Sequence, residues 1–477
     1  MEFLTSEYDT DSPGAEAELE VWESLKNAFD DSDTGVSYYK YPIVDKSGGR
    51  FDREPDFVVF HRELGLVIIE CKGFGIDNID RIDGYQWRLS GLDYRVDTPS
   101  EKAREQGFFL RSYFDRRPEL LDERQNNVVN VNWFVALPNI TRDEWKSRGF
   151  HEIPSAPKVI TQDELSPQTL RDKFFGLDTV RELSERQYEA ARSLLSGGEP
   201  ISGGRKPPVE HAENKKGLYN HVTEGLKQLD KKQEEFSVEI PPGPQQVRGI
   251  AGSGKTVLMA RKAARMHLRH PDWNIVLTFF TKSLYQQITE LVHDYYWQAA
   301  EEKPDWDKLQ IMHGWGGKTT LDGLYYNLAL ETTGNPRTFD SADELTDQES
   351  PSPPELLDVC CEELLDSSKI PRKYDAILID EAQDFEPNFY KMCYEALKEP
   401  KRLIWAYDEA QSLGSLDAPS PVNIFGEDKK GDPVVDLSGT YEGGIQKSKI
   451  MRRSYRAPRE VLMVGHAFGM GLNRDEG

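Results

Sequence analysis

The chain has few cysteines, no long apolar run and a shortage of positive charge, and each shortage excludes a class of protein. Its cysteines are Cys71, Cys360, Cys361 and Cys393. They form no Cys-x-x-Cys pair, which argues against a disulfide framework or a structural zinc site. No apolar run approaches the roughly 18 residues of a membrane-spanning helix, and residues 1–14 lack the apolar centre of a signal peptide. We therefore expect a reduced, cytoplasmic protein without a membrane partner.

The net charge of -24 also argues against a generally sticky nucleic-acid binder, because the mean field repels phosphate. A locally basic groove stays compatible with it. At 477 residues the chain is too long for one ordinary core, so we expect two or three domains. Residues 196–217 (SGGEPISGGRKPPVEHAENKKG) have the composition of a linker between an N-terminal and a C-terminal half. Residues 346–355 read as an exposed loop.

The N-terminal half begins with a helical apolar stripe after Pro13-Gly14. Two strand-like runs, Asp56–Phe60 and Gly65–Cys71, are separated by a short polar turn and predict a hairpin. A helix is predicted over Ser100–Phe114 and a further strand over Val128–Leu137.

The C-terminal half alternates apolar strands with helices. Strands are predicted over 246–250, 274–280, 375–380 and 402–407, and helices over 255–270 and from 283 onward. This alternation is typical of an α/β domain, with a mostly parallel sheet covered by helices on both faces.

Residues 249–256 read GIAGSGKT, a full match to the phosphate-binding pattern GxxxxGK[ST] between a predicted strand and a predicted helix. Glycines let backbone N–H groups surround phosphates, and the following helix start favours their negative charge. We expect Lys255 to reach the β- and γ-phosphates of ATP and Thr256 to bind Mg²⁺. The residues expected to bind the nucleotide here are Gly249, Gly252, Ser253, Gly254, Lys255 and Thr256.

A second apolar run, 374–384 (YDAILIDEAQD), ends in acidic residues. Asp380 is expected to hold Mg²⁺ and Glu381 to polarise the attacking water. An ordinary strand with an acidic turn is the alternative, and the presence of both motifs in one half favours an ATP site.

With these motifs in order, residues 225–470 resemble the UvrD/Rep-like superfamily 1 helicases. Further similar segments are Leu229–Gln233 (Q motif), Thr278–Leu284 (motif Ia), Met312–Trp315, Ala406–Ser412 (motif III) and Met451–Arg456 (motif IV). The resemblance implies that Gln233 reads adenine, Gln411 senses the γ-phosphate and Arg456 acts as an arginine finger. It also implies DNA as partner, either single-stranded or with a single-stranded end.

The C-terminal half departs from this family in two places. Leu413 and its neighbours stand where base-stacking aromatics usually follow motif III, so that Trp315, Tyr407 or Phe280 either substitutes for them or is simply core. The sequence ends at Gly477 without motifs V and VI. We expect a partner subunit or a further C-terminal segment to supply them.

In the predicted hairpin, Asp56 and Glu70 occupy facing positions, and Glu70 shares a strand face with Lys72 while Cys71 points away. Two carboxylates and a backbone carbonyl suit Mg²⁺, with Mn²⁺ also possible. The metal would activate water, and Lys72 would orient or deprotonate it. A solvated hairpin face is the alternative.

This D…ExK arrangement resembles PD-(D/E)xK nucleases, and residues 14–170 resemble the NERD (nuclease-related) domain. The segments that carry the resemblance are Gly14 with Glu18–Val21, Pro99–Gln106 and Asn132–Pro138. It implies that Glu18 is an auxiliary metal-binding carboxylate, the alternative being a solvated helix residue, and that Gln106 is a possible site residue.

The predicted fold class is α/β. A restriction-endonuclease-like nuclease domain spans 1–175 and a helical segment and linker span 176–217. A RecA-like P-loop domain spans 218–440, with a small insertion near 315–370, and a second RecA-like lobe begins in 441–477. We expect an ATP-dependent DNA helicase or translocase coupled to a Mg²⁺-dependent nuclease, in DNA repair or in defence against foreign DNA. The alternative is an ATP-switched DNA-binding or recruitment protein, whose nuclease-like module is inactive and whose motor needs a partner.

Overall fold

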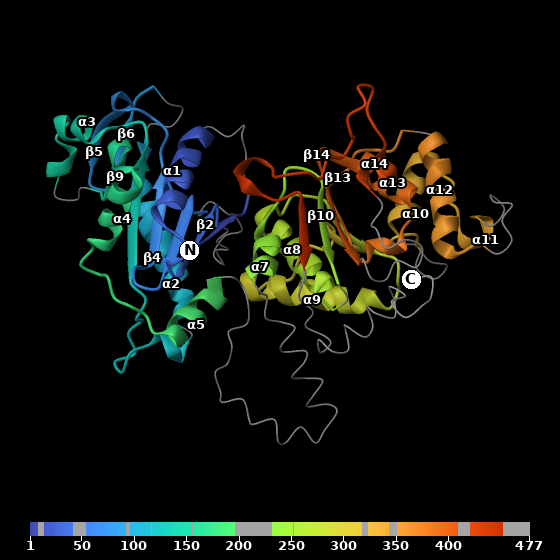
Figure 1. The fold of residues 1–477 in the computed structure, drawn as a ribbon, viewed down its shortest axis with the longest axis horizontal. Helices are drawn as coiled ribbons and strands as arrows, with labels where there is room; N and C mark the ends of the chain where they lie inside the picture. Colours follow the sequence, from blue (N-terminus) through green and yellow to red (C-terminus); the bar gives the residue numbers. More distant parts are fainter. Residues whose placement is uncertain are drawn as a thin grey trace, which may run out of the picture. The chain divides into compact units, whose positions relative to one another are not determined.

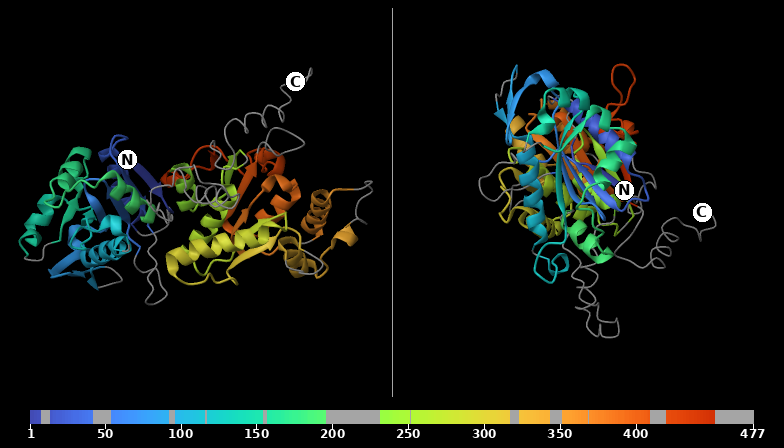
Figure 2. Two further views of the ribbon diagram at one scale, coloured as in Figure 1. Left: turned by 90° about the horizontal axis from the view of Figure 1, so that it is seen from below. Right: turned by 90° about the vertical axis from the view of Figure 1, so that its left-hand side faces the viewer.

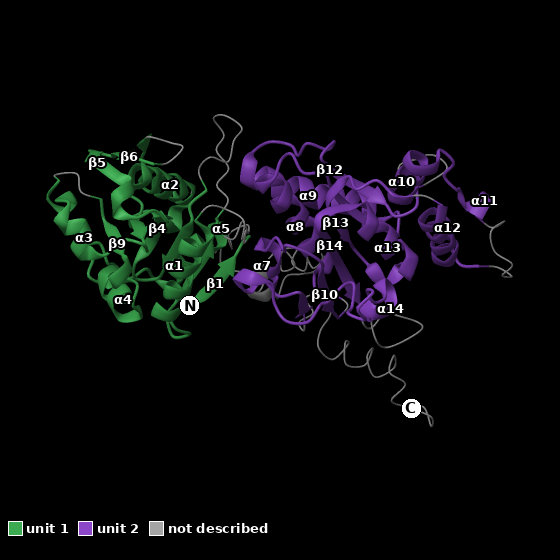
Figure 3. Cartoon of the chain, turned by 90° about the horizontal axis from the view of Figure 1, so that it is seen from above, with its two compact units in different colours: residues 1–205 green, residues 206–477 purple. Residues whose placement is uncertain are grey.

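The chain divides into two compact units, residues 1–205 and 206–477, coloured separately in Figure 3. The computed structural model describes residues 1–7, 14–41, 54–91, 96–115, 117–153, 157–195, 231–250, 252–316, 323–342, 351–367, 369–408 and 420–451. The boundary between the units falls inside the linker predicted over 196–217. The predicted γ-phosphate sensor Gln411 and arginine finger Arg456 lie outside the described residues.

Unit 1 is built on a mixed six-stranded sheet with the strand order β1-β2-β3-β4-β8-β9. Its strands are β1 (Glu2–Thr5), β2 (Gly35–Tyr39), β3 (Phe57–His61), β4 (Gly65–Cys71), β8 (Val131–Leu137) and β9 (Val159–Thr161). The predicted hairpin is confirmed, because β3 and β4 pair antiparallel, and β4, β8 and β9 then run parallel.

Helices cover both faces of this sheet (Figure 1). They are α1 (Ala15–Ala28) and α4 (Pro167–Phe175) on one face, and α2 (Pro99–Phe114) and α5 (Glu185–Leu195) on the other. Trp22 of α1 stacks on Phe57 of β3 with ring centroids 5.9 Å apart. Tyr188 of α5 stacks on Phe60 at 5.3 Å, so the helical segment that follows residue 175 packs on unit 1.

A small antiparallel sheet lies beside this layer. Its strands are β5 (Ile79–Asp83), β6 (Gln86–Leu89) and β7 (Val96–Asp97), and α3 (Arg142–Ser147) packs into the same cluster. Trp87 of β6 and Trp145 of α3 are both buried, with ring centroids 5.6 Å apart. β7 carries Asp97, whose carboxylate lies 2.9 Å from the ammonium group of Lys72, the residue that follows β4.

Unit 2 contains a six-stranded sheet with the order β12-β11-β13-β14-β10-β15, and every pair in it is parallel. The strands are β10 (Gln245–Gly249), β11 (Ile275–Phe279), β12 (Leu309–His313), β13 (Tyr374–Ile379), β14 (Leu397–Asp408) and β15 (Ser448–Met451). The predicted α/β class and the parallel sheet are confirmed.

Alternate strand residues of unit 2 enter different cores, as expected for a sheet buried on both faces. Leu378 of β13 belongs to a cluster with α7, α8 and α9, and Ile379 to a cluster with α10, α12, α13 and α14 (Figures 1 and 2). The helices are α7 (Lys231–Val238), α8 (Lys255–Arg269), α9 (Leu284–Ala300), α10 (Leu324–Thr333), α11 (Phe339–Ala342), α12 (Pro353–Ser367), α13 (Pro387–Ala396) and α14 (Pro421–Phe425). Among the described helices, none is both long enough and apolar enough to cross a membrane.

The position of β15 differs from the sequence-based expectation. Residues from 441 onward were expected to begin a second lobe, whereas β15 pairs with β10 in the sheet of unit 2, with Gly249 opposite Met451. A four-residue strand is too short to show a period of its own. Its position therefore depends on the edge that β10 leaves open.

Candidate functional sites

The phosphate-binding pattern forms a loop between β10 and α8. Gly252 and Gly254 adopt left-handed φ values of 75° and 84°, a conformation that favours glycine. A Cβ on Gly249 would lie 2.8 Å from Ser253 Oγ. The amino end of α8, which has no side-chain cap, follows this loop directly, so the loop has the features of an anion site.

Lys255 is 5% exposed, and its ammonium group contacts two carbonyl oxygens and one carboxylate of the protein. Its Nζ donates to the carbonyl oxygens of Gly249 and Ile250, at 3.0 and 3.2 Å, and pairs with Asp408 Oδ2 at 3.0 Å. Asp408 is the last residue of β14 and is also buried. A phosphate entering the loop must therefore compete with Asp408 for the ammonium group.

Asp380 and Glu381 follow β13 at the carboxyl edge of the parallel sheet, the edge at which the loop also lies. Asp380 is fully buried, and no donor among the described residues has hydrogen-bonding geometry to either carboxylate oxygen. Burial, and then the charge of Glu381, raise the pKa of Asp380 to about 7, and Thr256 and Lys255 oppose this shift. A carboxylate without donors is suited to a cation.

Gln383 connects Glu381 to β14. Its Nε2 donates to Glu381 Oε2 at 2.7 Å, and its Oε1 accepts from the backbone N–H of Asp408 at 3.0 Å. Glu381 itself has a left-handed φ of 47°, which costs a residue with a Cβ about 1 kcal/mol or more. Lys255, Asp408, Gln383 and Glu381 thus form one connected set. The sequence motifs indicated no role for Gln383 or Asp408, although Gln383 lies within 374–384 and Asp408 within Ala406–Ser412.

Gln233 of α7 lies against the phosphate-binding loop. Its side chain is 3% exposed, and Nε2 donates to the carbonyl oxygen of Ser253 at 2.6 Å. A Cβ on Gly254 would lie 3.0 Å from the same nitrogen. The predicted adenine reader is thus in contact with the loop that would hold the phosphates.

The aromatic residues considered for base stacking are mostly core residues. Trp315 and Tyr407 are 6% and 4% exposed and belong to one hydrophobic cluster, and Trp315 Nε1 donates to Arg337 O at 3.1 Å. Phe280 is half-buried between His313 and Phe385, with centroid distances of 5.7 and 5.6 Å. Burial therefore favours the core interpretation for Trp315 and Tyr407.

The hairpin of unit 1 brings the predicted D…ExK residues together. Phe57 pairs with Ile69, and continuing this register places Asp56 opposite Glu70. The backbone N–H of Cys71 donates to Asp56 Oδ2 at 2.7 Å. Lys72 Nζ lies 3.3 Å from Glu70 Oε1, as expected for residues on one strand face.

Two lysines that the sequence did not single out contact these carboxylates. Lys40 Nζ lies 2.8 Å from Glu18 Oε2 and 3.2 Å from Asp56 Oδ1, and Lys102 Nζ lies 2.7 Å from Glu70 Oε1. Glu18 is 8% exposed, so the alternative of a solvated helix residue is wrong. Lys102 stands four residues before Gln106 on the helix, a spacing that places both on one face and could have indicated it.

Burial and neighbouring charges set the protonation of this cluster. Burial, and then the charge of Asp56, raise the pKa of Glu70 to about 7, against the opposing effect of Lys102 and Lys72. Burial alone would lower the pKa of Lys72, but Glu70 and Asp97 raise it above its usual value, with Asp97 Oδ2 2.9 Å from Nζ. The same balance, with Asp56 and Glu18, raises the pKa of Lys40. Both lysines are therefore charged.

Some buried polar atoms near α2 and β4 are without a partner in the described part of the chain. Glu70 Oε2 and both amide atoms of Gln106 are among them. Such atoms mark places where a water, ion or ligand fits. Within the described residues no three His, Cys, Asp or Glu side chains are grouped so that they could hold a metal ion. The open Glu70 oxygen is nevertheless the type of donor that a hard cation prefers.

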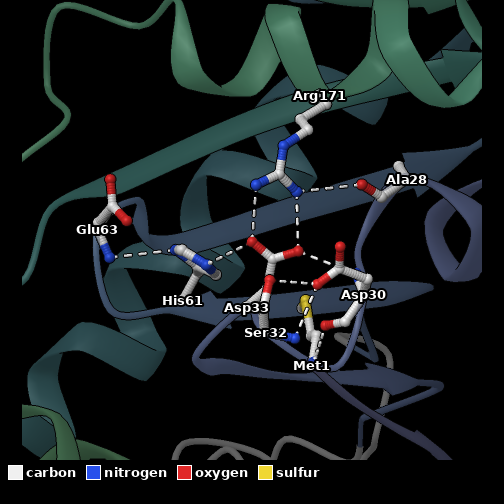
Figure 4. A network of polar contacts seen from close by, with 8 residues as sticks. All are labelled: Met1, Ala28, Asp30, Ser32, Asp33, His61, Glu63 and Arg171. Carbon is white, nitrogen blue, oxygen red and sulfur yellow. Dashed lines mark hydrogen bonds and ion pairs between the residues drawn. The ribbon is translucent and has the colours of Figure 1, made fainter.

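The carboxylate of Asp33, outside both sites, is 6% exposed and has a different environment (Figure 4). Arg171 of α4 donates to both oxygens of Asp33 at 2.8 Å and to Ala28 O at 3.2 Å. His61 Nε2 lies 3.7 Å from Asp33 Oδ1, and burial lowers the pKa of His61 to about 4. This cluster ties α4 to the end of α1.

No model of a known protein family matches the chain, and no curated protein matches it either. Function is therefore inferred from the residues of the two sites.

Proposed function

We propose that the chain is an ATP-hydrolysing DNA-processing enzyme, a UvrD/Rep-like motor unit joined to a Mg²⁺-dependent nuclease unit. The observation that carries the proposal is that Lys255 and the buried carboxylate of Asp380 lie at the same edge of the parallel sheet, close enough for Lys255 and Thr256 to act on the pKa of Asp380. A P-loop lysine and an acidic strand end are the two parts that phosphoryl transfer needs. On this proposal unit 2 is RecA-like and unit 1 restriction-endonuclease-like, and the activity serves DNA repair or defence against foreign DNA.

Each residue of the ATP site then has a defined task. Bound Mg²⁺ would neutralise phosphate charge, with Thr256 and Asp380 as its protein ligands. Lys255 leaves Asp408 and binds phosphate oxygens. Glu381, oriented by Gln383, accepts a hydrogen bond from the attacking water.

The nuclease site uses the hairpin residues. Asp56 and Glu70 would hold Mg²⁺ or Mn²⁺, with Glu18 as a further carboxylate; a bound metal lowers the pKa of its water. Lys72, held by Glu70 and Asp97, positions that water or takes its proton.

The test of the motor is ATP hydrolysis by the full chain with and without single-stranded DNA. We expect DNA-stimulated turnover that Lys255→Ala abolishes. Lys398→Ala is the matched control, since Lys398 pairs with Asp375 at the opposite edge of the same sheet. Turnover that is absent, or that survives Lys255→Ala, contradicts the proposal.

The second candidate function is an ATP-switched DNA-binding or recruitment protein with an inactive nuclease-like module. The observation that favours it is the occupation of all three carboxylates by lysine ammonium groups. Labelled DNA incubated with Mg²⁺ or Mn²⁺ separates the two. Cleavage that is lost in both Asp56→Ala and Glu70→Ala supports the nuclease, and no cleavage by any form supports the binding module.

A further inference from the structure

We propose that Lys40 and Lys102 are displaceable counter-ions of the nuclease site. They bind its carboxylates in the metal-free protein and give way when a divalent cation binds. The inference rests on the proposed metal site of unit 1 and assigns two residues that the D…ExK pattern does not contain.

Lys102 is placed so that it can leave. Its side chain is 33% exposed and reaches Glu70 Oε1 from α2, and among the described residues Glu70 is the sole ion-pair partner of its ammonium group. Lys72 differs, because it contacts both Glu70 and Asp97 and is 17% exposed. When Lys102 swings into solvent, Glu70 keeps Lys72 beside Oε1 at 3.3 Å, and Oε2 has no partner among the described residues.

Lys40 occupies the position of a bridging cation. Its ammonium group lies between Glu18, which comes from α1, and Asp56, which precedes β3, within 3.2 Å of both. Cations between two carboxylates from different elements bind by the same attraction, whether they are ammonium groups or metal ions. A metal that takes both oxygens must therefore displace Lys40.

The charge balance of the cluster supports displacement over simple addition. Glu18, Asp56, Glu70 and Asp97 face three lysines, Lys40, Lys72 and Lys102, whose ammonium groups offset most of their negative charge. A divalent ion added with all three lysines in place would be repelled by ammonium groups that lie within 3.3 Å of the same carboxylate oxygens. With both lysines moved to solvent and Lys72 retained, the same ion meets an excess of negative charge. Glu70 Oε2, on a side chain that is 2% exposed, has no partner among the described residues and is therefore an oxygen open to this ion.

The experiment titrates Mn²⁺ into the full chain without nucleotide, by calorimetry and by electron paramagnetic resonance of the free ion. Lys40→Met and Lys102→Met keep the aliphatic stem and remove the charge. We expect each to tighten Mn²⁺ binding about tenfold or more, the effect that one adjacent cation has on the proton affinity of a carboxylate. Adding Glu70→Gln to Lys102→Met should abolish the gain in Mn²⁺ affinity. This loss would assign the tighter binding to the site in unit 1 and not to unit 2.

The matched control is Lys173→Met. Lys173 Nζ lies 2.7 Å from Glu164, and its side chain is 19% exposed. Glu164 retains Arg142 when this lysine is removed, as Glu70 retains Lys72. We expect no change in Mn²⁺ affinity.

The outcomes separate this inference from the proposed function. If the wild-type chain binds Mn²⁺ and the Lys40→Met and Lys102→Met variants bind it equally or more weakly, the inference is overturned. The proposed function is not affected by that result. Tighter binding without any DNA cleavage supports the inference and removes the nuclease activity from the proposed function. No Mn²⁺ binding by any form removes both. Thermal melting identifies a variant that does not fold, and if this is Lys40→Met, the more exposed Lys102→Met decides the question.

Discussion

The two candidate sites treat their buried carboxylates in opposite ways. In unit 1, Glu18, Asp56 and Glu70 each contact a lysine ammonium group. In unit 2, Asp380 has no donor among the described residues, although the buried Lys255 belongs to the same site and pairs with Asp408 instead.

The difference lies in which carboxylate the lysine ammonium groups contact in each unit. On the proposed function, unit 1 holds lysines on the oxygens that a metal would use, so a metal would have to displace them. On the same proposal, unit 2 leaves the oxygens of Asp380 open to a metal and holds Lys255 on Asp408, so that a phosphate would have to displace Asp408. Both arrangements raise a carboxyl pKa to about 7, and burial is the largest cause in each.

The largest expected effect is on the chemical step in unit 2. Glu381→Gln should lower ATP turnover about 10²- to 10³-fold, because a group that orients or deprotonates water is lost. Nucleotide affinity should stay within about threefold, since binding depends on the loop and Lys255. Steady-state turnover and calorimetry measure the two. Glu331→Gln, a surface acid paired with Lys373, is the control. A large loss of affinity in Glu381→Gln would mean that Glu381 serves binding and not chemistry.

The next largest effect is on stability and is expected at Asp33, the carboxylate that accepts hydrogen bonds from Arg171 in Figure 4. Hydrogen bonds from Arg171 lower the pKa of Asp33 to about 2, so its stabilisation is present above the unfolded value of 3.8 and is lost as pH falls toward 2. Asp33→Asn should therefore destabilise unit 1 at pH 7 by about 2 kcal/mol, a figure reduced for the partial exposure of Arg171. Hydrogen exchange of α4 peptides measures it.

Its control is Asp83→Asn, which removes an acid from the more exposed Arg81. This change should cost under about 0.5 kcal/mol. Equal effects of the two substitutions would show that the Arg171 contact is no stronger than a surface pair.

The change of stability with pH is expected to have the opposite sign at Asp380, whose carboxylate oxygens have no hydrogen-bond partner among the described residues. Because the folded pKa of Asp380 is raised to about 7, the folded state binds the proton more tightly than the unfolded state, whose value is 3.8. Stability of unit 2 therefore falls as pH rises from about 4 to 7, and the cost is fully present above that range. Asp380→Asn should stabilise unit 2 at pH 8 by about 2 kcal/mol, and the gain should vanish near pH 4.

Hydrogen exchange of β13 and α8 peptides at the two pH values measures this gain. Asp375→Asn, on the same strand but paired with Lys398, is the control and should not stabilise. A loss of stability in Asp380→Asn at pH 8 would show that this carboxylate has a donor in solution.

The smallest expected effect is at Gln383. Gln383→Ala should lower ATP turnover about three- to tenfold with nucleotide affinity unchanged, since it removes one hydrogen bond that orients Glu381. Gln286→Ala removes a similar Gln–Glu contact from the surface of α9 and should change neither quantity. If affinity falls in Gln383→Ala, the link through Asp408 to Lys255 matters more than the orientation of Glu381.

Long periodic elements were predictable from sequence. The helices at 15–28, 99–114 and 255–269 and the strands of the hairpin agree with the predictions within a few residues, because their apolar periods are long. The small sheet β5–β7, the edge strands β1, β9, β12 and β15 and the inner strand β2 were not predicted. Each has five residues or fewer, and what holds it is a neighbouring strand or core far along the chain.

The site residues show the same division. Asp56, Glu70 and Lys72 follow from strand alternation, and Gly249–Thr256 from a local pattern. Lys40 and Asp408 follow from neither, because each meets its partner only after distant strands have paired.

By itself the sequence determined the α/β class, the parallel sheet of unit 2 and the residue types that meet at each site, since local period and spacing encode them. Only the tertiary structure decided which cation rests on which carboxylate. That choice depends on burial and on contacts such as Lys102 with Glu70 and Lys255 with Asp408, which join residues 32 and 153 positions apart in the chain. No local rule of spacing extends over such separations.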